Sequence, residues 1–110
     1  MEIDVRKEGQ AVVISLTGRM DAVAAPQFDR TAADLLAQGD RRIIIDFTAL
    51  EYISSAGLQS ILALAKQLED FEGTVILSSL AGPVREVFDI SGFSLIFPIY
   101  DRCEDALAAL

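Results

Sequence analysis

The chain has 110 residues, of which 52% are hydrophobic, and it carries a formal net charge of −8. This length and apolar content suit one compact domain with a sizeable core, whereas the negative charge and the nine scattered Lys and Arg residues argue against a nucleic-acid-binding surface. Because there is no histidine and only one cysteine, Cys103, a Cys-His catalytic pair, a His-ligated metal and an internal disulfide are also excluded.

The first third of the chain predicts an antiparallel hairpin followed by a helix. Residues 3–7 alternate apolar with polar side chains, and a turn signal around Gly9 precedes the apolar segment 11–18. Apolar side chains then recur at helical spacing until Gly39, which favours the left-handed conformation that ends helices. We therefore expect a helix from about Ala24 to Gln38.

The middle of the chain predicts a buried strand and a second helix. Residues 42–47 are β-branched and apolar through their centre, which is typical of a strand covered on both faces. We expect this strand, ending near Phe47, at the centre of the sheet. A helix should begin near Ser55 or Ala56, because an apolar stripe runs from Leu58 to Leu68 at helical spacing.

The last third continues the alternation of strands and helices. Residues 74–78 resume as a strand, a short helix opens at Gly82 and stops at Gly92, and another strand is expected near residues 95–99. Asp101 and Glu104 have the spacing of a capping box, with Asp101 as the cap of a terminal helix.

The resulting order, ββαβαβαβα, predicts a single α/β domain over residues 1–110. Right-handed crossovers give a mostly parallel five-stranded sheet, and the opening hairpin adds one antiparallel edge strand. We expect helices on both faces of this sheet. No internal repeat or low-complexity linker interrupts the pattern.

The segment Tyr52-Ile53-Ser54-Ser55-Ala56-Gly57-Leu58 places two hydroxyls and a glycine at the predicted turn from strand to helix. Backbone N–H groups are free at a helix start, so a hydroxyl there can be approached by another protein and can carry phosphate. A serine in this place is, taken alone, most often only an N-cap that contributes about 1 kcal/mol. Gly57 could likewise serve only close helix packing.

Two carboxylates, Asp21 and Asp46, stand at the ends of the second and third predicted strands. Either could simply cap a loop. Their joint placement favours a functional role, because partner and ligand sites of α/β sheets gather beyond the carboxyl ends of strands. No third metal ligand accompanies them, and no glycine-rich phosphate loop is present, so we expect neither a metal nor another cofactor, and no enzymatic activity.

Three segments together resemble the STAS domain, which is named for sulfate transporters and anti-sigma factor antagonists, and especially its small stand-alone antagonists. They are Leu16-Thr17-Gly18-Arg19-Met20-Asp21, Ile45-Asp46-Phe47-Thr48 and the serine-containing segment 52–58. The resemblance implies a partner switch. The unphosphorylated antagonist binds an anti-sigma factor serine kinase and frees a sigma factor, phosphorylation of one serine dissolves that complex, and a serine phosphatase resets it.

By position, the resemblance implies that Ser55 is the phosphoacceptor, because it stands two residues before Gly57. A helix that starts one residue earlier or later would present Ser54 instead. The best-known antagonists have an aspartate before the acceptor and a Ser or Thr after it, where this chain has Ser54 and Ala56. The implied partner-binding residues are Arg19, Asp21, Asp46, Thr48, Ser54, Ser55 and Gly57.

Two alternatives remain open at the level of the sequence: a non-catalytic accessory subunit of a transporter ATPase, and a scaffold module of a larger signalling assembly. Self-association would favour the scaffold, while for the antagonist we expect a monomer or weak dimer. The N-terminus resembles no export signal and no apolar run approaches the roughly 20 residues of a membrane span. We therefore expect a cytoplasmic protein without direct membrane insertion.

Overall fold

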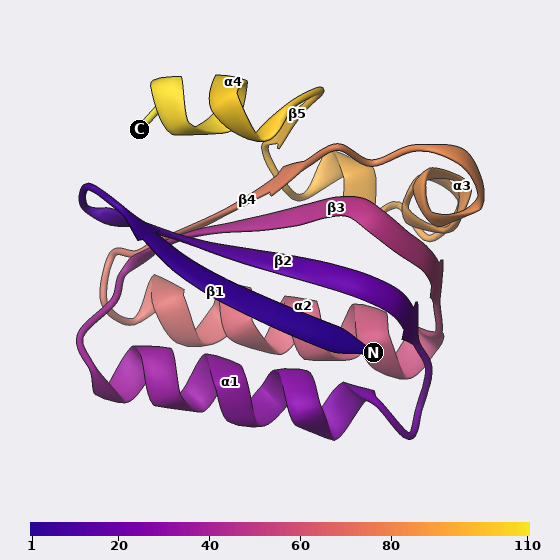
Figure 1. Cartoon of the computed structure of the whole chain (residues 1–110), viewed down its shortest axis with the longest axis horizontal. Coiled ribbons are helices and arrows are strands. Elements are labelled where there is room, and N and C mark those ends of the chain that lie inside the picture. The colour runs from indigo at the N-terminus through magenta and orange to yellow at the C-terminus, as the bar shows by residue number, and fades with distance from the viewer.

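The computed structural model describes residues 1–110 and contains the predicted succession of strands and helices (Figure 1). The strands are β1 (Glu2–Glu8), β2 (Ala11–Met20), β3 (Arg42–Ile53), β4 (Thr74–Ser78) and β5 (Ile99–Tyr100). The helices are α1 (Ala25–Ala37), α2 (Ser55–Glu69), α3 (Gly82–Ile90) and α4 (Cys103–Ala108), with a short 3-10 helix, η1 (Phe93–Leu95), before β5. No helix combines the length and the apolar character that crossing a bilayer would require.

The five strands form one mixed sheet in the order β1-β2-β3-β4-β5. β1 pairs with β2 in antiparallel fashion, and every other neighbouring pair is parallel. β3 is therefore the central strand, as predicted. Its residues Ile43, Ile44 and Ile45 are at most 1% exposed, which confirms that both faces of this strand are covered.

Helices lie on both faces of the sheet, which confirms the prediction. α1 and α2 run side by side below the sheet in Figure 1, and their apolar faces meet strand residues such as Ile43 and Ile45 in the main core. α3 adds Phe88 to this core, where its ring meets the Phe47 ring edge-on at 5.3 Å. α4 lies on the other face, where Ala106 packs against a smaller cluster that includes Ile44.

The expectation that the central strand ends near Phe47 is wrong, because β3 continues to Ile53. β2 is long enough to keep pairing with it: Gly18 lies opposite Leu50, and Met20 lies opposite Ile53, after shifts in register. β4 ends where its Ser78 faces Asp46. The second half of β3 therefore extends beyond β4 and carries the chain directly to the start of α2.

Two predictions near the C-terminus also need correction. The strand expected near residues 95–99 is present but begins only at Ile99: Gly92 adopts φ 80° and leads into η1, so pairing with β4 starts later than predicted. Asp101 does not cap the last helix. α4 begins at Cys103 with Arg102 in the N-cap position and no side-chain cap, while Arg102 forms exposed ion pairs with acids of the first turn.

Candidate functional site

Ser54 joins the end of β3 to the start of α2 and acts as the N-cap of that helix. Its backbone is extended, and its hydroxyl oxygen accepts a hydrogen bond from the Gly57 N–H at 3.2 Å. The same hydroxyl donates to the Met20 carbonyl oxygen at 3.1 Å. Ser54 is thus a fully engaged structural residue that satisfies one of the free N–H groups of the helix start.

Ser55, the next residue, has a different environment. It is the first residue of α2 and it is exposed. The side-chain hydrogen bonds at this turn belong to Ser54, and none involves the Ser55 hydroxyl. The hydroxyl also stands at the positive end of the helix dipole. Of the two adjacent serines, only Ser55 offers a free and accessible hydroxyl.

Gly57 is buried where the first turn of α2 meets the ends of β2 and β3. A Cβ atom at this position would lie 2.8 Å from Ile53 Cγ1, 3.0 Å from Met20 Cγ and 3.1 Å from the Met20 carbonyl oxygen. These distances are shorter than ordinary van der Waals contacts. The glycine is therefore required for the close approach of helix and strands, which in turn fixes the position of the serine turn.

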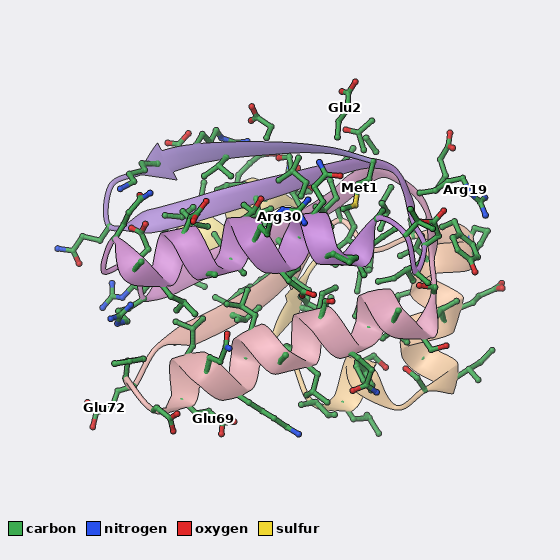
Figure 2. All side chains as sticks on the ribbon, turned by 90° about the horizontal axis from the view of Figure 1, so that it is seen from below. Met1, Glu2, Arg19, Arg30, Glu69 and Glu72 are labelled. Atoms are coloured by element: carbon green, nitrogen blue, oxygen red, sulfur yellow. The ribbon has the colours of Figure 1, made fainter.

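Arg19 and Asp21 flank Met20, so both lie at the same end of the sheet as the two serines. The Arg19 guanidinium carbon stands 4.2 Å from the centroid of the Tyr52 ring, a cation–π geometry. Figure 2 shows Arg19 projecting at the end of the molecule opposite Glu69, the last residue of α2. Sequence reasoning missed this role of Tyr52, because the pairing of Arg19 with Tyr52 depends on the register shift between β2 and β3.

Asp21 organises the turn before α1. Its carboxylate oxygen Oδ1 accepts a hydrogen bond from the Ala24 N–H at 2.9 Å, as the loop-cap alternative predicted. Asp21 and Arg19 also border a shallow hollow of about 430 Å³ that includes Val23, which is 89% exposed. An exposed apolar side chain beside two charged ones gives this end of the molecule a surface suited to a protein partner.

Asp46 and Thr48 lie elsewhere. Asp46 Oδ1 accepts hydrogen bonds from the Thr48 N–H at 3.1 Å and the Thr48 hydroxyl at 2.7 Å. The rest of β3 separates this pair from Ser54, so Asp46 does not stand at a strand end as predicted. Asp46 instead affects Cys103 at the start of α4: burial raises the pKa of the Cys103 thiol, and the charge of Asp46 raises it further.

The structure therefore brings five of the seven predicted site residues to one end of the sheet and separates the other two. The five are Arg19, Asp21, Ser54, Ser55 and Gly57, and the separate pair is Asp46 and Thr48. No group of three or more metal-ligating side chains occurs in the chain. What the gathered residues provide is a free hydroxyl at a helix start, surrounded by exposed charged and apolar side chains.

The mixed five-stranded sheet with helices on both faces, and the serine turn at the start of α2, define a small α/β domain. The chain matches the STAS domain model over residues 2–106 and belongs to that family. A relative from Bordetella bronchiseptica, named as the anti-sigma factor antagonist BtrV, is 39% identical over 109 residues, which cover 99% of this chain and 94% of the relative.

Two solved structures are similar along almost the whole chain. The phosphorylated form of SpoIIAA, a Bacillus cell fate determinant, aligns with a TM-score of 0.77 and 26% identity, covering 98% of each chain. An anti-sigma factor antagonist from Thermotoga maritima, tm1081, aligns with a TM-score of 0.92 at 21% identity, covering 97% of this chain and 92% of that one. The latter likeness confirms the fold.

Proposed function

We propose that this protein is a cytoplasmic anti-sigma factor antagonist that works by partner switching, with Ser55 as the phosphoacceptor. The unphosphorylated form binds an anti-sigma factor serine kinase and thereby releases a sigma factor. Phosphorylation of Ser55 dissolves the complex, and a serine phosphatase restores the binding form. The protein itself is a non-enzymatic regulator. The names of its relatives, BtrV above all, support the antagonist role.

The observation that carries the assignment of Ser55 is the difference between the two serine hydroxyls. The Ser54 hydroxyl both donates and accepts a hydrogen bond within the fold, whereas the Ser55 hydroxyl is exposed and makes none. A kinase must reach the hydroxyl and deprotonate it, and phosphate on Ser54 would remove its hydrogen bond to Met20. The existence of a phosphorylated form of the structurally similar SpoIIAA supports a phosphate switch on this fold.

Phosphate on Ser55 should act on the partner more than on the fold. It adds roughly −1.5 to −2 charge and three acceptor oxygens. At the start of α2 this charge meets free N–H groups and the favourable end of the helix dipole, a contribution of about 0.3 to 1 kcal/mol. In an interface that accepts a neutral hydroxyl, the same group adds bulk, requires desolvation and repels acids such as Asp21. The bound complex is therefore the state that phosphorylation destabilises.

The test is phosphorylation by serine kinases encoded near this gene, with ATP, followed by intact-mass and peptide mass spectrometry. Wild type, Ser54→Ala and Ser55→Ala are compared. A single phosphate that is lost only in Ser55→Ala would establish the acceptor. A phosphate lost only in Ser54→Ala would show that Ser54, and not Ser55, is the phosphoacceptor. No phosphate from any candidate, together with stable binding to a transporter ATPase, would replace the switch with an accessory-subunit role.

A further inference from the structure

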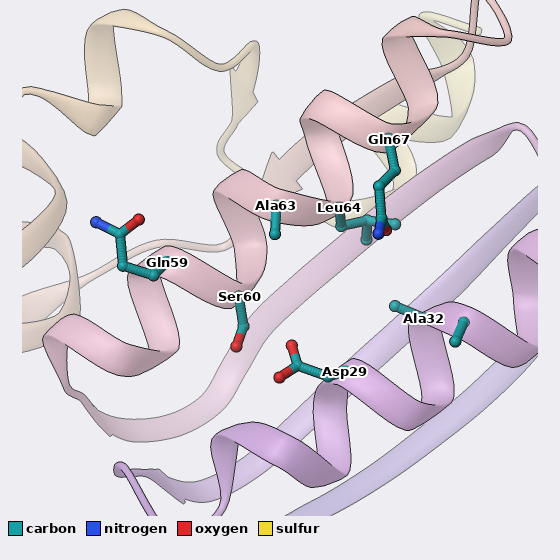
Figure 3. Close-up of a pocket in the computed structure, with 8 residues that line it drawn as sticks. Asp29, Ala32, Gln59, Ser60, Ala63, Leu64 and Gln67 are labelled. Atoms are coloured by element: carbon teal, nitrogen blue, oxygen red, sulfur yellow. The ribbon is translucent and has the colours of Figure 1, made fainter.

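β1 forms an open edge of the sheet. It is the first strand in the order β1-β2-β3-β4-β5, so it pairs with β2 on one side and with no strand on the other. α1 and α2, which line the hollow drawn in Figure 3, cover a face of the sheet and not this edge. Figures 1 and 2 show β1 at the border of the molecule with no other element beyond it. One row of its backbone N–H and C=O groups is therefore free to pair with another strand.

β1 lacks several features by which natural proteins block an edge strand. It is seven residues long, contains no proline, and pairs with β2 in an unbroken register without a bulge. Lys7, whose charge would repel a second strand, is drawn to Asp40 at 3.6 Å. The centre of the edge holds Asp4, which forms no ion pair, and Val5, which is 39% exposed. Because most other side chains of β1 are charged, their order decides which strand can pair with it.

The order of charges along β1 is self-complementary when two copies run antiparallel. Hydrogen-bonding positions alternate along a strand, so a two-fold pairing of identical edges has to be centred on a residue. Centring on Val5 places Asp4 opposite Arg6 of the second copy, on both sides of the axis. Centring on Asp4 or on Arg6 instead brings like charges together on the axis, which destabilises strand pairing. The register through Val5 is therefore the one that the charges favour.

The side chains in this register are suited to the pairing. Arg6 uses three of its five N–H donors within the chain, and its side chain is 42% exposed, so donors remain for Asp4 of the second copy. Like charges meet only at the ends of the paired segment, where Glu2 comes opposite Glu8. The charge of Glu8 is offset there by its own ion pair with Arg6 at 3.2 Å.

We propose that two copies of this protein associate through β1, in the antiparallel register centred on Val5. The pairing adds the hydrogen bonds of one strand edge and two symmetric ion pairs of Asp4 with Arg6. A single strand edge is small beside the roughly 800 Å² per partner of a stable interface, so the dimer is weak and reversible. A second copy is favoured over a foreign strand, because the complementary charges are already present in β1 itself.

The inference goes beyond the proposed function, because it rests on β1 and not on the serine turn. The two-fold axis through Val5 runs across the paired strands and reverses their direction. It therefore places the two serine turns at opposite ends of the dimer, where each Ser55 stays exposed. Self-association and the phosphate switch should thus be independent of each other.

The first test is the concentration dependence of the full chain. Sedimentation velocity and ¹H–¹⁵N spectra are recorded from micromolar to millimolar concentration. We expect the sedimentation coefficient to rise with concentration and the amide shifts on dilution to be confined to β1 and β2, equally in wild type and Ser55→Asp. No concentration dependence at millimolar protein would overturn the inference. So would shifts confined to another exposed apolar surface, such as Ile90, Leu95 and Ile96.

The second test exchanges the charges of the proposed pair. Asp4→Lys and Arg6→Glu each turn two attractions into repulsions, so either variant alone should self-associate about tenfold more weakly than wild type. An equimolar mixture restores both attractions, since each introduced side chain then faces one of opposite charge, and should associate like wild type. Glu69→Lys, an equal change of charge at an exposed position of α2, is the control and should not weaken association.

Thermal unfolding checks that the variants remain folded. Equal association of every variant, or a mixture that associates no better than its components, would overturn the register centred on Val5.

The outcomes separate this inference from the proposed function. A protein that stays monomeric at millimolar concentration but binds an anti-sigma factor kinase would overturn the edge pairing and leave the switch intact. A dimer that binds no such kinase would overturn the switch and leave the edge pairing intact. Amide shifts in β1 that arise only when the kinase is added would assign the edge to a partner strand and overturn self-pairing.

Discussion

Ser54 and Met20 are joined by two hydrogen bonds to one acceptor: the Ser54 N–H and the Ser54 hydroxyl both donate to the Met20 carbonyl oxygen, at 2.9 and 3.1 Å. The residues are 34 positions apart, and the contact connects the end of β2 to the start of α2. The serine turn is therefore fixed by the sheet itself. Because the position of the turn is fixed, the exposure of Ser55 follows from the fold itself.

Ser54→Ala should lower the free energy of unfolding. The variant loses the N-cap and the hydroxyl bond to Met20, and the two losses together are worth about 1 to 2 kcal/mol. Urea unfolding followed by circular dichroism measures the change. Ser55→Ala is the matched control, and as an exposed substitution it should stay within about 0.5 kcal/mol of wild type. Equal destabilisation by both variants would contradict the different environments of the two serines.

Ser55→Asp should leave the stability of the domain nearly unchanged while it weakens partner binding. A carboxylate in the first turn of α2 meets the helix dipole favourably, by about 0.3 to 1 kcal/mol. Thermal unfolding at low salt measures the change in stability. Binding of the kinase to the same variant measures the loss of affinity. A large drop in melting temperature would show that charge at Ser55 disrupts the domain itself, and the switch would then act through unfolding.

Gly57→Ala should destabilise the protein although alanine is the better helix former. Helix propensity alone would stabilise the variant by about 1 kcal/mol. The added Cβ, however, would stand 3.1 Å from the backbone oxygen of Met20, an atom that cannot rotate away. Overpacking of this kind typically costs about 1 to 3 kcal/mol, so we expect a net loss in urea unfolding.

Ala63→Gly on the same helix is the control for propensity. Ala63 is exposed in the middle of α2, so its replacement should cost about 1 kcal/mol through propensity alone. If Gly57→Ala instead stabilises the protein by a similar amount, the close approach of α2 to β2 and β3 is not rigid.

The order of elements and the central position of β3 could be predicted, because both depend on hydropathy patterns that are local in sequence. The continuation of β3 to Ile53 could not, since Glu51 and Tyr52 interrupt the apolar run and only the long partner β2 holds them in the sheet. The short β5 was misplaced for a similar reason. Its two residues form a strand because they pair with β4, and no periodicity in the segment indicates this pairing.

The site was predictable in part. The serine turn, Asp21 and Gly57 occupy places that follow from the strand-to-helix pattern. Asp46 was assigned to the same site because its strand was expected to end there, and the extra length of β3 removes it. The sequence also left open which serine is free. That distinction depends on the Met20 carbonyl, which lies close to Ser54 only in the folded chain.

Arg19→Ala should cost little stability and should weaken partner binding more. The contact with Tyr52 is partly exposed, and cation–π pairs at exposed sites contribute about 0.5 to 1 kcal/mol. Arg19→Lys keeps the charge and serves as the control. Urea unfolding and kinase affinity are measured on both variants. A loss of stability in Arg19→Ala much larger than this, with unchanged affinity, would make Arg19 a structural residue only.

Cys103 should react slowly with iodoacetamide near neutral pH, because burial and the charge of Asp46 raise the pKa of its thiol and reduce the fraction of thiolate. Asp46→Asn removes one of the two causes and should shift the pH profile of alkylation to lower pH, while the new amide oxygen can still accept the hydrogen bonds from Thr48. Glu69→Gln, an exposed change of equal charge on α2, should leave the profile unchanged. A profile that does not move in Asp46→Asn would show that Asp46 is too well solvated to act on α4, and would leave burial as the sole cause of the raised pKa.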